Sequence, residues 1–351
     1  ASAFAIQNLC QAGDNIVSST DLYGGTWNQF ENTFKKLGIE VRFADPKDPM
    51  SFVKLSDNKT RAFYGETLPN PKLNVLPIEE IASLGKELGI PLIVDNTAAP
   101  ITCKPIEHGA AIVIHSLTKW IGGHGTSIGG IIVDGGNFDW TKIPERHPNF
   151  NQPEPSYWNW VLGKVVPDVL GANITFAVRL RFVLLRDLGS ALSPTNAFNF
   201  IQGLETLPIR FKKHQENAEK VADYLTGKNN VNRVINPKYQ LGIHKERAEK
   251  YLKDGNGPLV GFELKGGIEA GKKFIDSLEL IYHVANIGDA RTLAIHPAST
   301  THSQLSTEDQ LRAGVTPGYI RLSVGIEHID DIINDIDQAI NKAQDKVKNV
   351  A

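Results

Sequence analysis

The chain has 351 residues, of which 41% are hydrophobic, and a formal net charge of -2 at pH 7. This length favours two domains with a large core, and the near-neutral charge argues against an electrostatic grip on nucleic acid. No apolar run is long enough to span a membrane, and two cysteines in no paired spacing, Cys10 and Cys103, favour a reducing compartment, the cytoplasm.

Strand and helix patterns alternate over the first 135 residues. Short apolar runs predict strands at residues 14–19, 39–45, 60–66, 90–96, 110–116 and 129–136. Helical spacing of apolar residues predicts helices at 27–38 and 77–89, each of which ends at a glycine. The strand IPLIVDN is almost wholly apolar, as central strands of parallel sheets are. The alternation therefore predicts an α/β fold with a mostly parallel sheet wrapped by helices.

The alternation stops between residues 136 and 168, where the chain is rich in Pro, Asn and Trp. The aromatic residues favour an ordered loop, although irregular stretches this long are uncommon in compact domains. Beyond it the sequence predicts helices at 171–188, 209–227 and 269–278, a strand at 258–264, and a last helix with an isoleucine stripe from Ile329 to Ile340. We therefore expect a large domain over residues 1–215 and a smaller C-terminal α+β domain over residues 216–351.

Polar and aromatic side chains follow four of the predicted N-terminal strands. They are Tyr23, Asn70, Asp95, Ser116, Thr118 and Lys119. Ligands of parallel α/β sheets bind beyond the carboxyl ends of the strands, so we expect these side chains to converge at one edge. Each also has an ordinary structural explanation, because strand-end aspartates commonly cap turns and hydroxyls commonly bond turn amides. Their convergence is what predicts a site.

Together these residue types describe a pyridoxal 5′-phosphate (PLP) site. A lysine is costly to bury without a function, and the aldehyde of the cofactor needs an amine such as Lys119 for its Schiff base. A carboxylate such as Asp95 keeps the ring nitrogen protonated, so that the ring can accept electrons. The Tyr23 ring, which precedes two glycines, suits stacking, and the hydroxyls of Ser116 and Thr118 suit phosphate oxygens.

Three other kinds of site fit the sequence less well. SLTK is a Ser-x-x-Lys motif, as in penicillin-recognising acyl-transfer enzymes, but SDN precedes it and no Lys-Thr-Gly follows. GGHGTSIGG resembles a dinucleotide-binding loop, yet Ile128 stands where the third glycine is due. His108, His115 and His124 lack the ligand spacing of a zinc site, so we expect no metal.

The strings DLYGGT, VDNT, HSLTKWIGGHG, HPASTTHSQLS and GYIRLSVGIEHIDDI resemble the Cys/Met-metabolism PLP-dependent enzymes, and the likeness spans nearly the whole chain. The resemblance implies the PLP-dependent transferase fold of type I. It further implies that Lys119 forms the Schiff base and that Asp95 pairs with the ring nitrogen. Tyr23 is then the residue that stacks on the ring and helps with proton transfer.

The same resemblance assigns the remaining contacts. Ser116 and Thr118 contact the cofactor phosphate, and Asn70 forms a hydrogen bond near the phenolic oxygen. Arg321 clamps the substrate carboxylate with its planar guanidinium, and Thr292 lies near that carboxylate. The alternation of residues 319–324 also fits a surface charge on a strand, so this second explanation of Arg321 stays open.

The aromatic stretch after VDGGNFDW and the string IHPASTTHSQLS are most similar to the O-acetylhomoserine sulfhydrylases of that family. This likeness implies a γ-replacement in which O-acetyl-L-homoserine and sulfide give L-homocysteine and acetate. A cystathionine or methionine γ-lyase on the same site, and a truncated chain without activity, stay open as alternatives. The implied partners are an amino-acid substrate, sulfide or a thiol, and further copies in a homodimer or homotetramer, without nucleic acid or membrane.

The first residues, ASAFAIQNLCQ, have the pattern of a helix already under way, and the single methionine of the chain is Met50. We expect a preceding segment to be missing, because the Tyr-x-Arg arm and the Ser-Gly loop of the family are not found in this sequence. On that expectation, this chain binds PLP more weakly than a longer chain would.

Overall fold

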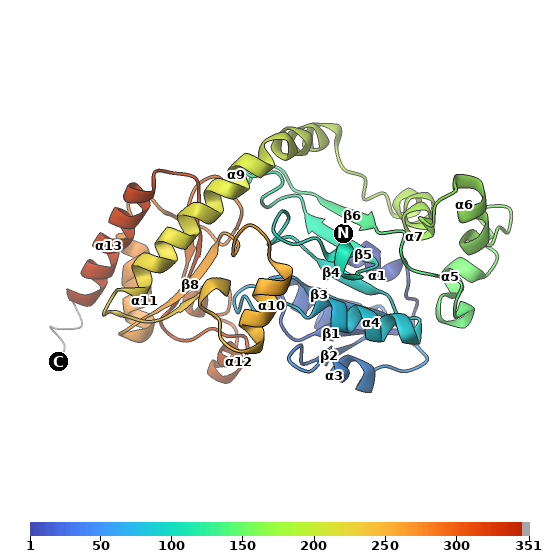
Figure 1. Cartoon of the computed structure of the whole chain (residues 1–351), viewed down its shortest axis with the longest axis horizontal. Helices are drawn as coiled ribbons and strands as arrows, with labels where there is room; N and C mark the ends of the chain where they lie inside the picture. Colours follow the sequence, from blue (N-terminus) through green and yellow to red (C-terminus); the bar gives the residue numbers. More distant parts are fainter. Residues whose placement is uncertain (346–351) are drawn as a thin grey trace.

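The computed structural model describes residues 1–345, which form two β-sheets joined by a long helix (Figure 1). The first sheet has the strand order β2-β1-β3-β4-β5-β6, and the second has the order β7-β8-β11-β10-β9. The strands are β1 (Asn15–Ser19), β2 (Glu40–Ala44), β3 (Thr60–Glu66), β4 (Leu92–Asp95), β5 (Ile112–Ser116), β6 (Gly130–Asp134), β7 (Val231–Ile235), β8 (Leu259–Leu264), β9 (Tyr282–His283), β10 (Leu293–Ile295) and β11 (Tyr319–Ser323).

Helices of three kinds cover and connect these sheets. The α-helices are α1 (Ser2–Gln7), α2 (Gly24–Asn28), α3 (Met50–Lys54), α4 (Ile78–Leu88), α5 (Pro148–Asn151), α6 (Leu162–Leu170), α7 (Thr175–Arg179), α8 (Arg186–Leu188), α9 (Pro194–Thr226), α10 (Ile243–Tyr251), α11 (Gly267–Ser277), α12 (Thr307–Arg312) and α13 (Ile329–Asp345). The π-helical segments are η1 (Gln29–Phe34) and η4 (Leu180–Leu185), and the 3-10 helices are η2 (Pro105–His108), η3 (Pro144–Arg146), η5 (Pro237–Tyr239) and η6 (Pro297–Ser299).

Strands β1 to β5 run parallel, as predicted, and each of the six predicted N-terminal strands lies within two residues of its observed bounds. Strand β6 differs, because it pairs antiparallel with β5. A parallel neighbour needs a crossover that carries the chain back to the starting edge, usually as a helix. Residues 117–129 contain no helix and return the chain from the edge at which β5 ends.

Alternate residues of the central strands face two different hydrophobic cores. Val17 and Phe63 pack in one core with Ile81 of α4. Ile16, next to Val17 in β1, packs in the other core with Phe30 of η1. Because both faces are covered, the strands read as continuous apolar runs instead of alternating ones. The second sheet has its own core with the isoleucine stripe of α13.

Most predicted helices exist, but two have a different internal structure. The helices expected at 77–89 and 269–278 are α4 and α11. The helix expected at 27–38 is α2 followed by the π-helical segment η1, and the one expected at 171–188 is α7, η4 and α8 in succession. An apolar stripe indicates a helix but does not distinguish its hydrogen-bonding pattern.

Helix α9 joins the two sheets and is longer than the predicted helix at 209–227. It begins at Pro194, where the Ser193 hydroxyl accepts a hydrogen bond from the Asn196 N–H. Pro208 lies within it, and because proline removes a donor inside a helix, the sequence indicated a boundary there. Phe211 belongs to the core of the first sheet.

The second half of α9 packs on the second sheet, with Val221 in the core there. In Figure 1 the helix runs diagonally from above the first sheet to the second sheet. The predicted domain division between residues 215 and 216 falls inside this helix and stays a prediction.

The irregular stretch at 136–168 is ordered, as its aromatic residues suggested. Trp140 and Phe150 are buried, with ring centroids 4.8 Å apart, and both pack against Phe176 of α7. The stretch includes the short helices α5 and α6, which lie at the far right of Figure 1.

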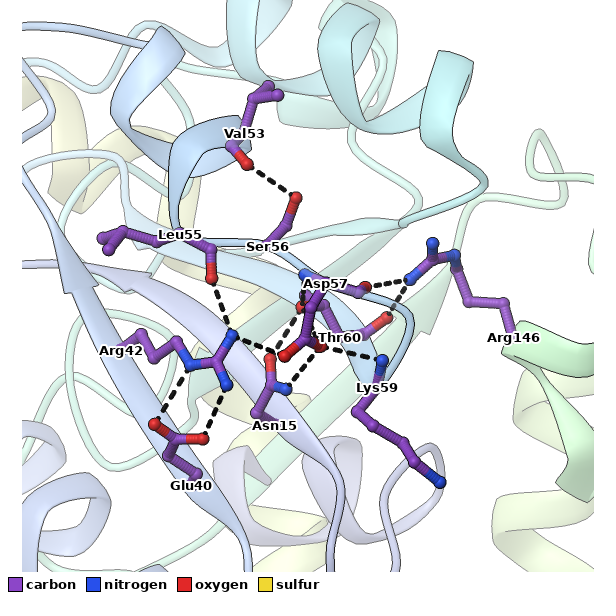
Figure 2. A network of polar contacts seen from close by, with 10 residues as sticks. All are labelled: Asn15, Glu40, Arg42, Val53, Leu55, Ser56, Asp57, Lys59, Thr60 and Arg146. Carbon is purple, nitrogen blue, oxygen red and sulfur yellow. Dashed lines mark hydrogen bonds and ion pairs between the residues drawn. The ribbon is translucent and has the colours of Figure 1, made fainter.

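A polar network ties together the amino ends of β1, β2 and β3 (Figure 2). Asp57 accepts hydrogen bonds from Nδ2 of Asn15 at 2.9 Å and pairs with Nη1 of Arg42 at 2.8 Å. Nη1 of Arg146 donates to the carbonyl oxygens of Asp57 and Thr60 at 2.9 and 2.8 Å. This network stabilises one edge of the sheet. The polar residues of the predicted site gather at the opposite edge, where the parallel strands have their carboxyl ends.

No helix within residues 1–345 is long and apolar enough to cross a bilayer.

Candidate active site

A cavity of about 280 Å³ opens at the carboxyl-end edge of the first sheet and reaches β11 of the second. Six of the eight predicted site residues line it: Tyr23, Asn70, Asp95, Ser116, Lys119 and Arg321. The expected convergence is therefore confirmed for five of the six strand-end residues, and Thr118 is the exception. The physical cause of the convergence is that β1, β3, β4 and β5 are parallel and end at the same edge.

Lys119 lies in the turn that follows β5, where its backbone N–H donates to the Ser116 carbonyl at 3.3 Å. In the cavity its Nζ donates to Oδ1 of Asn286. Burial, and then the positive charge of Arg321, lower the pKa of Lys119 to about 8. A lysine with such a pKa holds part of its amine neutral near neutral pH, as a nucleophile or a base requires.

Asp95 ends β4, and its Oδ1 accepts a hydrogen bond from the Thr97 N–H at 2.9 Å. Burial raises the pKa of Asp95, although the hydrogen bonds from Thr97 act in the opposite direction. The carboxylate therefore both caps the turn and lines the cavity, and its pairing with a ring nitrogen stays a prediction. A cationic group bound in the cavity would stabilise the charged form of this carboxylate.

Tyr23 precedes α2 and keeps 54% of its surface exposed. A Cβ atom on Gly25 would lie 2.5 Å from Cε1 of the Tyr23 ring, so the ring can take this position only above a glycine. The backbone N–H of Tyr23 donates to Oε1 of Glu66 at 2.8 Å. An open aromatic face at the cavity suits stacking on a flat ring, and this role of Tyr23 stays a prediction.

Arg321 is only 6% exposed, which excludes the surface charge that its strand pattern also allowed. Its Nη2 donates to the carbonyl oxygens of Ala285 and Asn286 at 2.8 and 3.0 Å. Burial lowers the pKa of Arg321 to about 10, and Nε has no partner among the described residues. A buried guanidinium with an unused donor at a cavity suits a carboxylate ligand.

Two predicted residues do not line this cavity. Thr118 lines a neighbouring cavity of about 210 Å³ beside α9, and its hydroxyl accepts a hydrogen bond from the Gly129 N–H at 3.2 Å. Thr292 is fully buried; its hydroxyl donates to Oε2 of Glu327 at 2.8 Å and accepts from the Gly325 N–H at 2.9 Å. The structure thus places Thr292 outside the lining of this cavity, and the contacts predicted for both threonines stay predictions.

Three residues at the site were missed from the sequence. Glu66 ends β3 at the edge where Asp95 ends β4, and the strand-end rule applied to TRAFYGE would have found it. Thr97 lies two residues after Asp95, and its Oγ1 accepts a hydrogen bond from the Ser116 N–H at 2.8 Å. Asn286 comes from the loop before β10, where no sequence rule used above points to a site.

The residues of the cavity fit PLP. Oδ1 of Asn70 is buried and has no hydrogen-bond partner within residues 1–345, so it is available to a ligand. Lys119 supplies a partly neutral amine for an aldehyde, Asp95 a carboxylate for a pyridinium, and Tyr23 an open ring face. Across the described part of the chain, no group of three or more His, Cys, Asp or Glu side chains is arranged to hold a metal ion.

Comparisons with known proteins found similar sequences and a similar structure. The family model described as Cys/Met metabolism PLP-dependent enzyme matches residues 1–341. O-acetyl-L-homoserine sulfhydrylase of Leptospira meyeri is 52% identical over 97% of this chain and 78% of its own length. Homocysteine synthase of Schizosaccharomyces pombe is 46% identical over 97% of this chain and 78% of its own.

A solved structure shares the fold with a TM-score of 0.90 at 39% identity, over 97% of this chain and 80% of its own. Its description names an O-acetylhomoserine (thiol)-lyase from Campylobacter jejuni that carries a pyridoxyl-lysine monophosphate residue. The expected fold of type I is confirmed by this likeness.

Proposed function

Because the chain belongs to the Cys/Met metabolism PLP-dependent enzyme family, we propose that it catalyses a γ-replacement on O-acetyl-L-homoserine. Sulfide takes the place of acetate at the γ-carbon, and the products are L-homocysteine and acetate. The names of relatives at 46–52% identity support this choice within the family. The observation that carries the proposal is that Lys119, with a pKa of about 8, shares one cavity with Asp95 and Arg321.

Each of these side chains has a separate task in the proposed reaction. When bound, PLP supplies an electron sink for the α-carbon of the substrate. Lys119 anchors the cofactor and moves the α-proton, for which its lowered pKa suits it. Asp95 keeps the ring nitrogen protonated, and the buried guanidinium of Arg321, whose Nε has no partner among the described residues, binds the substrate carboxylate. Tyr23 holds the ring plane by stacking.

The test is a product assay on the purified chain supplied with PLP, O-acetyl-L-homoserine and sulfide. We expect homocysteine and acetate in equal amounts, with little 2-oxobutanoate. Accumulation of 2-oxobutanoate and ammonia, with or without sulfide, would identify γ-elimination and refute the replacement. Absence of any product from a chain that binds PLP would refute catalysis by this chain altogether.

We also propose that the chain works in the cytoplasm. Cys10 and Cys103 are both free and buried. Unbridged thiols are typical of proteins in reducing compartments, where glutathione and thioredoxin keep cysteines reduced.

We propose that a second copy of the chain covers an apolar face formed by the start of α9 and the turn before β6. Phe198, Ile201 and Leu204 follow one another at intervals of three residues along α9, and each is more than half exposed. Ile128 adjoins them, since its carbonyl accepts a hydrogen bond from Nδ2 of Asn196, and its side chain is also exposed. Contiguous exposed apolar residues of this size commonly mark an interface.

The expected result is that the double variant Phe198→Asp/Ile201→Asp has a lower molar mass in solution than the unaltered chain. Two carboxylates in an apolar interface would be desolvated without partners, which opposes association. Sedimentation equilibrium measures the mass. The control is Leu241→Asp, which alters a highly exposed leucine before α10 and should change nothing. A monomeric unaltered chain, or an unchanged mass in the double variant, would contradict the proposal.

A further inference from the structure

A second carboxyl group lies beside Asp95 in the cavity. Glu66 is the last residue of β3 and pairs in register with Asp95, the last residue of β4. Both line the cavity, and Glu66 is only 7% exposed. Side chains at paired positions of neighbouring strands leave the sheet on the same face. The two carboxyl groups are therefore neighbours at the cavity.

Acidic groups dominate the surroundings of Glu66. Burial, and then the negative charges of Asp95 and Asp21, raise the pKa of Glu66, while the hydrogen bond from the Tyr23 N–H acts in the opposite direction. The Lys72 side chain is engaged with Asp21, because its Nζ pairs with Oδ1 of Asp21 at 2.7 Å. The electrostatic neighbours that shift the pKa of Glu66 are therefore both acidic.

Other titratable groups lie beside this pair, and the basic side chains of Lys119 and Arg321 line the same cavity. Tyr64, on β3, is fully buried, and burial together with the charges of Asp95 and Glu66 raises its pKa, so it stays a neutral phenol. The positive charge of the Ala1 amino group lowers the pKa of Asp95 and so favours the charged form of that carboxyl group. Neighbouring carboxylates disfavour each other's ionisation, and burial together with Asp95 raises the pKa of Glu66, so the proton of the pair is held more readily by Glu66.

Glu66 also holds the backbone that carries the Tyr23 ring. Its Oε1 accepts the hydrogen bond from the Tyr23 N–H at 2.8 Å, at the residue that precedes α2. An accepting oxygen is all that this contact requires, and a neutral carboxyl group or an amide supplies one. The loss of this oxygen would leave the Tyr23 N–H without its partner and loosen the ring.

We propose that Glu66 is a positioning residue of the cofactor site, a neutral carboxyl group that fixes Tyr23 at the start of α2 and leaves the negative charge of the pair on Asp95. The inference rests on the proposed function, from which Tyr23 and Asp95 take their roles, but its tests need no turnover. A chain that binds PLP as described below and makes no homocysteine would refute the proposed function alone.

The first test is the pH dependence of thermal unfolding of the cofactor-free protein. A carboxyl group whose folded pKa is raised contributes stability below its unfolded pKa of about 4.3, and that stability is lost as pH rises through the folded pKa. Glu66→Gln needs no proton, so its melting temperature should lie closest to that of the unaltered protein near pH 4. At pH 8 it should be higher by about 2 °C or more.

The control for this test is Glu87→Gln, on the exposed side of α4, which should show no such divergence with pH. A melting temperature of Glu66→Gln that falls below that of the unaltered protein as pH rises would show an ionised Glu66. A difference that does not depend on pH would equally overturn the proposal.

The second test measures PLP affinity by absorbance titration. We expect Glu66→Gln to bind PLP within about twofold of the unaltered chain and Glu66→Ala to bind about tenfold more weakly, the equivalent of one lost hydrogen bond. In a Tyr23→Ala background, Glu66→Ala should cost nothing further, because Glu66 acts through Tyr23. Equal losses in Glu66→Gln and Glu66→Ala, or additive losses with Tyr23→Ala, would overturn the assignment.

Discussion

Lys119→Ala should abolish covalent attachment of PLP and lower turnover by about a thousandfold or more. Positioned proton transfer alone contributes roughly 10²–10⁴ in rate, and this variant also loses the anchoring amine. Lys119 is suited to both tasks because burial and Arg321 lower its pKa to about 8. Borohydride reduction of the holoenzyme followed by peptide mapping measures attachment, and the product assay measures turnover.

Lys104→Ala is the matched control, since the side chain of Lys104 is 70% exposed and pairs with Glu107 on the surface. It should leave both attachment and turnover unchanged. Recovery of the reduced cofactor on another lysine, with Lys119→Ala still trapping it, would contradict the assignment.

Asp95→Asn should lower turnover by on the order of a hundredfold or more while the fold survives. The amide has nearly the same volume, and its oxygen can still accept the hydrogen bond from the Thr97 N–H. It cannot supply the negative charge that keeps a ring nitrogen protonated. Steady-state turnover and thermal unfolding of the same preparation separate the two effects.

Asp134→Asn is the matched control, because it makes the same chemical change at an aspartate in a different place on the first sheet. Asp134 also ends a strand of the first sheet and accepts hydrogen bonds from the Gly136 and Ala177 N–H groups. Because β6 runs antiparallel, Asp134 lies at the opposite edge from Asp95. We expect its substitution to leave turnover unchanged even where it costs stability. Unchanged turnover in Asp95→Asn with PLP bound would remove Asp95 from the proposed mechanism.

The strands of the first sheet were predictable because buried parallel strands leave an unbroken apolar signature, as in IPLIVDN and AAIVIHS. Because parallel strands end at the same edge of a sheet, the sequence alone also predicted that the residues after these strands lie together. The structure places Tyr23, Asn70, Asp95 and Ser116 at that edge. The long helix α9 was only half predicted, because Pro208 and the exposed apolar residues of its first half obscured both its continuity and its buried face.

The sequence by itself determined the alternating fold, the site edge and the chemical type of the site, because strand periodicity and strand-end chemistry are local properties. Only the tertiary structure decided that β6 runs antiparallel, that Arg321 is buried, and that Asn286 reaches Lys119. It also decided that Glu66 shares its environment with Asp95. These facts depend on which distant segments meet. Burial, strand pairing and electrostatic coupling arise from contacts between elements, so the sequence of one element alone does not reveal them.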